Sequence, residues 1–301
     1  MADVDMSGKT VLITGGNSGI GSFTAVGLAR MGARVVFTSR NPRKGDVARA
    51  ELREAAETKS IDYMALDLAS FTSIAAFADQ YLAKYDRLDV LILNAGVILD
   101  ARTETKEGFE TTFGVNHLGH FYLTQLLRER LEASAPARVV VVASDAYRGA
   151  REGLDFDDLM ATRDYKPLRA YAHSKLANIL FTNELARQLE GKGVTANSLH
   201  PGVVRTGLGR DGDVRSLLGR VALSVMRPFL ISPERGARTS IYLASSPEVE
   251  GESGGYYVSC RPAKRIAPAT DEGAARRLWQ VSEELVAEGK ATAKAKARRP
   301  S

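Results

Sequence analysis

Cysteine is nearly absent from this 301-residue sequence, in which Cys260 stands alone. No intrachain disulfide can form, and the sequence contains no cysteine-based metal motif. The four histidines form no HExxH or similar arrangement, so we expect no metal site. No stretch reaches roughly eighteen consecutive apolar residues, and the N-terminus has the pattern of neither a signal peptide nor a membrane anchor. We therefore expect a cytoplasmic protein without an integral membrane segment.

A strong excess of one charge is also missing over most of the chain, and the net charge is only +5. The last dozen residues, KATAKAKARRPS, are the exception and have no apolar face. Their cations are Lys290, Lys294, Lys296, Arg298 and Arg299. This composition predicts a disordered, solubilising tail over residues 290–301, and a nucleic-acid or anionic-lipid contact is the less favoured alternative. We expect no nucleic-acid partner.

Apolar runs alternate with helical patterns along the chain. Seven runs predict strands, over residues 9–14, 33–39, 61–68, 88–96, 137–144, 194–202 and 254–260. Near-continuous valine, isoleucine and leucine runs separated by helices indicate strands buried on both faces of a sheet. Right-handed crossovers then give an α/β fold, a doubly wound, Rossmann-type, mostly parallel seven-stranded sheet with helices on both faces. Residues 1–289 are predicted to form a single domain.

Two segments interrupt this alternation. Residues 145–168 are polar and loop-like, whereas residues 203–236 contain the apolar run SLLGRVALSVMRPFLI. Long excursions in compact α/β domains are usually functional or disordered. We therefore predict two substrate-side insertions, with the apolar 214–231 stretch as a substrate lid. Packing of that stretch on the core or on another subunit is the alternative.

The stretch TGGNSGIG (14–21) lies between the first predicted strand and the first predicted helix. Glycines there allow a tight turn and let a pyrophosphate approach the helix N-terminus, where unpaired N–H groups and the helix dipole favour an anion. The spacing is GxxxGxG, and not the GxGxxG of the commoner dinucleotide fold. A glycine turn for packing alone is the weaker interpretation. We predict cofactor contacts from Gly15, Asn17, Ser18, Gly19, Ile20 and Gly21.

The second predicted strand ends in FTSRNPRKG and is followed by no acid before Asp46. An NAD site often has an acidic residue there, which holds the ribose 2′-hydroxyl. A guanidinium instead clamps a 2′-phosphate, which a carboxylate would repel. We therefore predict NADP(H) as the preferred cofactor, with Ser39 and Arg40 as its binding pair. If the cations of this loop are only solvated, NAD(H) is the alternative.

The stretch RAYAHSKLANILFTNELARQL (169–189) predicts an amphipathic helix that also carries polar groups in its first turns. Tyr171 and Lys175 are four residues apart and therefore share one face of the helix. His173 and Ser174 are predicted to point elsewhere and to take no part in chemistry. A tyrosine and a lysine at this spacing occur often by chance, so the pair gains weight only from other motifs.

Those motifs are TGxxxGxG, LNAG at 93–96, a serine after the fifth strand, and YxxxK, in that order. Together they resemble the short-chain dehydrogenase/reductase superfamily, from about residue 7 to residue 260. Three longer stretches are similar, more narrowly, to the retinol dehydrogenase and WW-domain oxidoreductase branch. They are FGVNHLGHFYLTQLL (113–127), VVASDAYR (141–148) and YAHSKLANILFTNEL (171–185).

The resemblance implies an oxidoreductase that acts on CH–OH donors, with a catalytic tetrad of Asn116, Ser144, Tyr171 and Lys175. In the family, the asparagine holds a water that relays protons to the lysine. Further cofactor contacts are implied for Asp67, Leu68, Asn94, Ala95, Gly96, Tyr171, Lys175, Pro201, Gly202, Val204 and Thr206. Dimers and tetramers are usual in the family, so the resemblance leaves a homo-oligomer as an open alternative.

The chemistry of these side chains agrees with the implied roles. Reduction of a carbonyl needs a proton donor at the developing alkoxide, and an unperturbed tyrosine has a pKa of about 10. The Lys175 cation is expected to lower the pKa of Tyr171 to about 7. Ser144, at the carboxyl end of the fifth strand, faces the crevice where open α/β sheets bind ligands, so it can orient the substrate carbonyl.

Ser144 and Tyr171 are 27 residues apart, about twice the separation common in the family. Because the extra residues join two catalytic positions, we expect them at the substrate mouth, which favours a bulky, lipophilic, retinal-like aldehyde or ketone. Two other functions stay open. One is an NADP(H)-binding redox-sensing scaffold without turnover, which a degenerate tetrad would favour. The other is reduction of a carbon–carbon double bond, as in the protochlorophyllide reductases.

Overall fold

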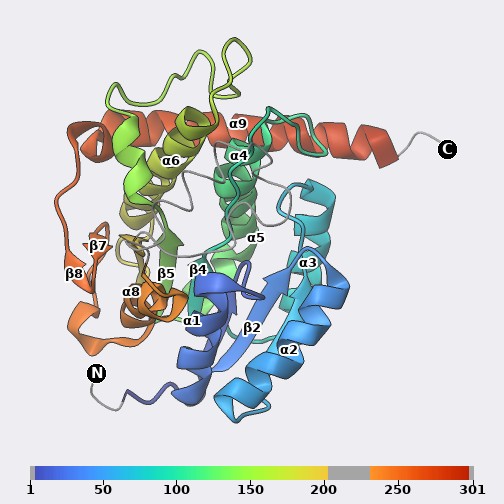
Figure 1. The fold of residues 1–301 in the computed structure, drawn as a ribbon, viewed down its shortest axis with the longest axis vertical. Coiled ribbons are helices and arrows are strands. Elements are labelled where there is room, and N and C mark those ends of the chain that lie inside the picture. The colour runs from blue at the N-terminus through green and yellow to red at the C-terminus, as the bar shows by residue number, and fades with distance from the viewer. Residues whose placement is uncertain (1–3, 203–230, 298–301) are drawn as a thin grey trace.

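A computed structural model describes residues 4–202 and 231–297, and its strands form one twisted sheet (Figure 1). The strand order is β3-β2-β1-β4-β5-β6-β7-β8, and β1 to β7 are all parallel. These seven are β1 Thr10–Ile13, β2 Arg34–Ser39, β3 Ile61–Ala65, β4 Val90–Leu93, β5 Ala137–Val142, β6 Val194–His200 and β7 Tyr256–Val258. Each lies inside a range predicted from the apolar runs, so the doubly wound fold is confirmed.

An eighth strand corrects the predicted count of seven. β8 (Arg261–Pro262) pairs with β7 in the antiparallel direction at the edge of the sheet. Two exposed residues form no apolar run, and a proline cannot donate to a ladder, so the usual strand signals are missing there.

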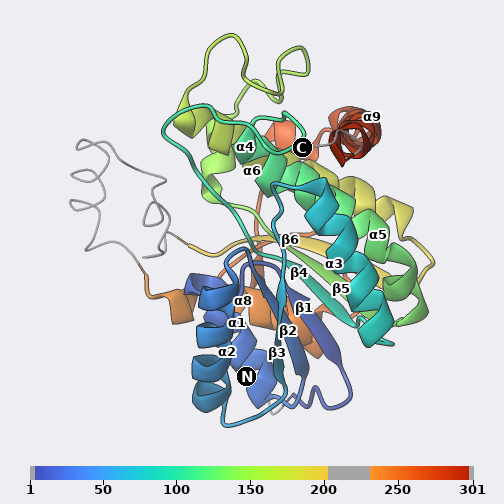
Figure 2. The same ribbon diagram turned by 90° about the vertical axis from the view of Figure 1, so that its right-hand side faces the viewer.

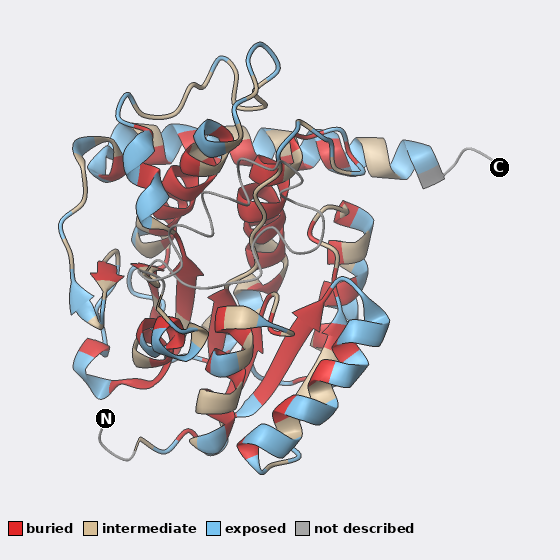
Figure 3. Cartoon of the chain, viewed as in Figure 1, coloured by how far each residue is buried: buried red, intermediate tan, exposed pale blue. Residues whose placement is uncertain are grey.

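Helices cover both faces of the sheet (Figure 2). One face carries α1 (Gly19–Arg30), α2 (Pro42–Ala56) and α8 (Pro233–Ser245). The other carries α3 (Phe71–Lys84), α5 (Gly119–Ala133) and α6 (Pro167–Gln188), and α9 (Glu272–Ala297) packs against the helices of this layer. Because both faces are covered, the central strands are buried along most of their length (Figure 3).

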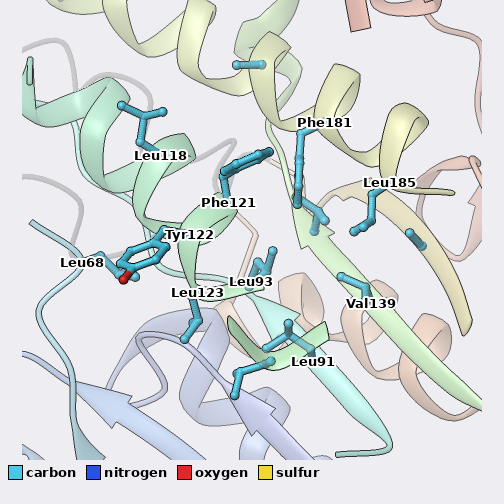
Figure 4. Close-up of a cluster of buried hydrophobic side chains, with 14 of the residues drawn as sticks. Leu68, Leu91, Leu93, Leu118, Phe121, Tyr122, Leu123, Val139, Phe181 and Leu185 are labelled. Carbon is cyan, nitrogen blue, oxygen red and sulfur yellow. The ribbon is translucent and has the colours of Figure 1, made fainter. Parts of the chain in front are cut away.

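Aliphatic side chains, together with some aromatic rings, fill the core between the sheet and the α5–α6 pair (Figure 4). The Phe121 ring centroid lies 5.8 Å from that of Phe181 and 4.9 Å from that of Trp279. Trp279 also stacks on Phe181 at 5.8 Å. Because Trp279 belongs to α9, these contacts fix α9 across α5 and α6.

α9 continues to Ala297, so the prediction of a disordered tail is wrong for residues 290–297. Residues 298–301 lie outside the described part of the chain. Alanine and lysine, which dominate this stretch, are good helix formers. Lys296 Nζ also donates to the Lys106 carbonyl oxygen at 2.6 Å. Among the described helices, none combines the length and the apolar character that a membrane span needs.

Irregular segments gather near the carboxyl ends of the strands. A short helix α4 (Thr111–Phe113) and a π-turn η1 (Gly114–Leu118) lead into α5, and a 3-10 turn η2 (Asp145–Gly149) follows β5. Residues 150–166 form a loop without regular structure. Two further 3-10 turns lie elsewhere: η4 (Pro247–Val249) between α8 and β7, near the start of β5, and η5 (Ala267–Thr270) before α9.

The 150–166 loop lies against the segment that follows β4. The Tyr165 hydroxyl donates to the Leu99 carbonyl oxygen at 2.9 Å, and Arg102 Nε donates to the Met160 carbonyl oxygen at 3.0 Å. This insertion therefore lies on the side of the sheet edge where β4 and β5 end. Most of the second predicted insertion, residues 203–230, lies outside the described part of the chain. Nearly all of the predicted substrate lid falls within those residues.

Candidate active site

The turn between β1 and α1 packs tightly against the residue that follows β4. Asn94 Nδ2 donates to the carbonyl oxygens of Thr14 at 2.8 Å and Gly15 at 3.1 Å. A Cβ at Gly21 would lie 2.5 Å from the Gly15 carbonyl oxygen, so only glycine fits there. The N-cap residue Ser18 makes no side-chain cap, which leaves the first N–H groups of α1 for an anion. The predicted contacts along this turn are Gly15, Asn17, Ser18, Gly19, Ile20 and Gly21.

The carboxyl end of β2 carries the predicted ribose-phosphate contacts. Ser39 is buried, and its hydroxyl donates to the Asn41 carbonyl oxygen at 3.3 Å. Arg40 is exposed and has no ion-pair partner among the described residues. The nearest acid further along the chain, Asp46, pairs with Arg49 at 3.2 Å. The Arg40 guanidinium is therefore available to an anionic group at this sheet edge.

Asp67 and Leu68 follow β3 at the same edge. One carboxylate oxygen of Asp67 accepts from the Ala69 N–H at 3.0 Å, so the turn engages only half of the carboxylate. The Leu68 side chain is buried in the core (Figure 4), so this residue can offer a cofactor only its backbone.

Tyr171 and Lys175 lie on adjacent turns of α6. Lys175 Nζ is 5.6 Å from the centroid of the Tyr171 ring and donates to the Val142 carbonyl oxygen, at the end of β5, at 3.1 Å. Ser144 follows β5, and its hydroxyl caps η2 by accepting from the Ala146 N–H at 3.3 Å. The fold thus brings three of the four implied tetrad residues together at the carboxyl end of β5.

Asn116, the fourth implied residue, lies in the π-turn η1. Its amide is held at both ends by Val97, whose N–H donates to Oδ1 at 2.8 Å and whose carbonyl accepts from Nδ2 at 3.0 Å. A Cβ at Gly96 would lie 3.3 Å from both Asn116 Oδ1 and Lys175 Nζ. The missing side chain at Gly96 leaves a narrow space against these two groups, which suits a cofactor that must pass close to the lysine.

Ser174, which was predicted to point away and to take no part in chemistry, belongs to this hydrogen-bond network. Its buried hydroxyl accepts from Asn116 Nδ2 at 3.0 Å and donates to the Tyr171 carbonyl oxygen at 2.8 Å. It therefore ties the π-turn to the start of α6. The spacing could have revealed it, because residues three apart on a helix are neighbours as much as residues four apart.

Burial dominates the ionisation of the tyrosine. Desolvation raises the pKa of Tyr171, and a hydrogen bond with the Ser144 side chain offsets this only in part. Desolvation also lowers the pKa of Lys175 to about 8. The expected lowering of the Tyr171 pKa by Lys175 is therefore wrong for the protein chain by itself, because both groups lose solvent together.

Pro201 and Gly202 follow β6 at the same edge. The residue before them, His200, accepts through Nδ1 from the Asp145 N–H at 3.1 Å. This bond joins the end of β6 to the residue after Ser144. The predicted contacts outside the described residues are Val204 and Thr206.

The sequence is similar to those of known dehydrogenases. The family model for short chain dehydrogenases matches residues 9–155. Human retinol dehydrogenase 14 is 49% identical over 294 residues, which cover 93% of this chain and 87% of that protein. Mouse retinol dehydrogenase 12 is 45% identical over 284 residues, which cover 94% of this chain and 88% of that protein.

Solved structures repeat the likeness. An uncharacterised protein from Mycobacterium paratuberculosis has a TM-score of 0.75 and 36% sequence identity, over 95% of this chain and 96% of its own. The NADP active-site complex of Pseudomonas aeruginosa RhlG has a TM-score of 0.66 and 26% identity, over 84% of this chain and 94% of its own.

Replacing Ser174 by alanine should lower the free energy of unfolding by roughly 1–3 kcal/mol, because a buried N–H of Asn116 and a carbonyl of Tyr171 would both lose a partner. Urea denaturation followed by the fluorescence of Trp279, the single tryptophan, measures this. Ser245→Ala is the matched control, since that buried hydroxyl bonds only the Ile241 carbonyl of its own helix. Equal losses in the two variants would contradict a bridging role for Ser174.

Proposed function

This chain belongs to the short-chain dehydrogenase/reductase family, in its retinol dehydrogenase branch, and we propose that it uses NADP(H) to interconvert a lipophilic, retinal-like aldehyde or ketone and its alcohol. As a family member it is an oxidoreductase that acts on CH–OH donors with a nicotinamide cofactor. The single observation that carries the proposal is the buried Lys175 ammonium beside Tyr171 and Ser144.

The proposed chemistry divides proton and hydride between chain and cofactor. The nicotinamide cofactor, when bound, supplies the hydride in reduction and accepts it in oxidation. Tyr171 gives its phenol proton to the developing alkoxide oxygen in reduction and takes it back in oxidation. The Ser144 hydroxyl donates a hydrogen bond to the same oxygen and stabilises its developing charge.

Lys175 and Asn116 serve the tyrosine in this proposal. An ammonium has three N–H donors, and the Val142 carbonyl takes one, so two are left to hold a cofactor ribose and a relay water. The polar atoms of the Asn116 side chain already have protein partners. Oδ1 accepts from the Val97 N–H, and Nδ2 donates to the Val97 carbonyl oxygen and to the Ser174 hydroxyl. Only its main-chain carbonyl is left to hold the relay water.

The 150–166 loop supports a lipophilic substrate. Its half-buried apolar side chains pack against the core at the carboxyl ends of β4 and β5, and they are Leu154, Phe156, Leu159 and Met160. An apolar wall at that place favours a substrate with a large hydrocarbon part. The names of the human and mouse relatives, retinol dehydrogenases, support a retinoid or a compound of similar shape.

An NADPH-oxidation screen over all-trans-retinal, aliphatic aldehydes, ketones and enones tests the proposal, with Tyr171→Phe as the blank. We expect wild-type turnover of lipophilic aldehydes or ketones, and a loss of roughly 100-fold to 10,000-fold in Tyr171→Phe with NADPH affinity preserved. Tight NADPH binding without turnover would contradict the proposal and favour the scaffold. Turnover of enones alone would favour reduction of the carbon–carbon double bond.

Arg40 should set the cofactor preference. Arg40→Ala is expected to raise the KM for NADPH about tenfold or more and to leave the KM for NADH unchanged, since a hydrogen bond to a charged group contributes roughly 1.5–3 kcal/mol. Arg49→Ala removes a neighbouring cation that already pairs with Asp46, and serves as the control. Similar KM values for NADH and NADPH in the wild-type protein would overturn the preference for NADP(H).

A further inference from the structure

His120 is a buried histidine next to the proposed site that no step of the proposed chemistry uses. It lies in the first turn of α5, one helical turn after Asn116, and only 2% of its surface is exposed. Both ring nitrogens have partners. Nδ1 lies 3.1 Å from the Asn116 carbonyl oxygen, and Nε2 lies 2.9 Å from Thr14 Oγ1.

These partners determine which ring nitrogen carries the proton. A carbonyl oxygen can only accept, so Nδ1 must hold the hydrogen that points to Asn116. In the neutral ring Nε2 is then an acceptor, and the Thr14 hydroxyl must donate to it. The other acceptor near this hydroxyl, the Ile92 carbonyl oxygen, is more distant at 3.4 Å. The result is one directed chain of hydrogen bonds, Thr14 to His120 to Asn116.

The chain of bonds begins at the cofactor turn. Thr14 Oγ1 accepts from the Asn94 N–H at 2.9 Å and from the Ala95 N–H at 3.1 Å, in the LNAG turn after β4. Thr14 is also the last residue before the glycine turn, whose carbonyls Asn94 holds. His120 therefore lies between the two turns predicted to contact the cofactor and the carbonyl predicted to hold the relay water.

We propose that His120 is a positioning residue that, as a neutral Nδ1–H imidazole, aligns the Asn116 carbonyl with the cofactor turns. This inference rests on the proposed function, because the alignment matters only where Asn116 serves a proton relay. The π-turn gives it a physical reason. The Gly119 N–H bonds to the Gly114 carbonyl five residues back, so the helix is widened at Asn116 and a side chain must help to hold its carbonyl.

The surroundings keep the ring neutral. Desolvation lowers the pKa of His120 to about 4, the bond to the Asn116 carbonyl opposes this, and the Lys175 cation adds to the lowering. A protonated ring would put a second buried cation beside Lys175 and would leave the Thr14 hydroxyl only the more distant Ile92 carbonyl oxygen as acceptor, at 3.4 Å. The directed chain of bonds requires the uncharged form.

Two substitutions separate the two bonds of His120. The amide nitrogen of asparagine can take the place of Nδ1, so His120→Asn keeps the bond to Asn116 and loses the one to Thr14. The amide of glutamine reaches the place of Nε2, so His120→Gln keeps the bond to Thr14 and loses the one to Asn116. We expect about a tenfold fall in kcat for His120→Gln with unchanged NADPH affinity. For His120→Asn we expect kcat within about twofold and an NADPH Kd weakened about fivefold.

His117→Phe is the matched control. His117 is equally buried and neighbours Asn116 in sequence. Its Nε2 bonds the Ser282 hydroxyl of α9 at 2.8 Å and not a residue of the proposed site. We expect a lower Tm and a kcat within about threefold of wild type, because the Phe113 and Phe181 rings that surround it accept another aromatic ring. Equal kcat losses in His120→Gln and His117→Phe, or no loss in His120→Gln, would overturn the positioning role.

Nitrogen-15 NMR of the histidine rings at about pH 7 supplies a readout that needs no substrate. With four histidines, the His120 signals are assigned by their loss in His120→Leu. We expect a neutral Nδ1–H ring, whereas an Nε2–H ring or an imidazolium would overturn the inference. The two failures are distinguishable: a protein that turns over no carbonyl but shows the Nδ1–H ring contradicts the proposed function alone.

Discussion

The ammonium group of Lys175 is buried at the carboxyl end of β5, and within the described residues no carboxylate pairs with it. An unpaired buried cation is costly, and the fall of its pKa to about 8 expresses that cost. The fold tolerates it through the Val142 carbonyl and through the space beside Gly96, where an anionic or polar cofactor can approach. Because Lys175 bonds the Val142 carbonyl at the end of β5, the first turns of α6 lie at that edge of the sheet, and Tyr171 lies there with them.

The groups placed around this cation are uncharged and are ordered by hydrogen bonds of fixed direction. Asn116 is held at its side chain by Val97 and Ser174 and at its carbonyl by His120. Each bond uses a donor or acceptor that would otherwise be buried without a partner. Neutral groups suit this position because another positive charge would make the ammonium still less stable. The same hydrogen bonds connect the cofactor turn to the π-turn. The polar groups of the site therefore form one hydrogen-bond network inside an apolar core.

How much of this could be read from sequence differs from residue to residue. The strands were predictable because buried parallel strands are continuous apolar runs. The family resemblance was enough to predict that Ser144, Tyr171 and Lys175 lie close together. The direction in which the pKa of Tyr171 shifts was not predictable, because it depends on how deeply Tyr171 and Lys175 are buried. His120 was missed because its partner Thr14 lies in a distant part of the chain and no local pattern points to it. Ser174 was missed although its spacing of three residues from Tyr171 could have revealed it. The helix at residues 290–297 was missed because a polar Ala/Lys stretch predicts both a tail and a helix, and contact with Lys106 decides between them.

The pH dependence of kcat/KM for NADPH tests the role of the buried cation most directly, since this quantity reports the free enzyme. The pKa of Lys175 is lowered to about 8, so the lysine is charged below that pH and loses its proton as the pH rises through it. We expect kcat/KM to fall about tenfold per pH unit above about pH 8, and Lys175→Met to have a low and level profile there. A wild-type value that stays constant up to about pH 10, or the same fall in Lys175→Met, would contradict it.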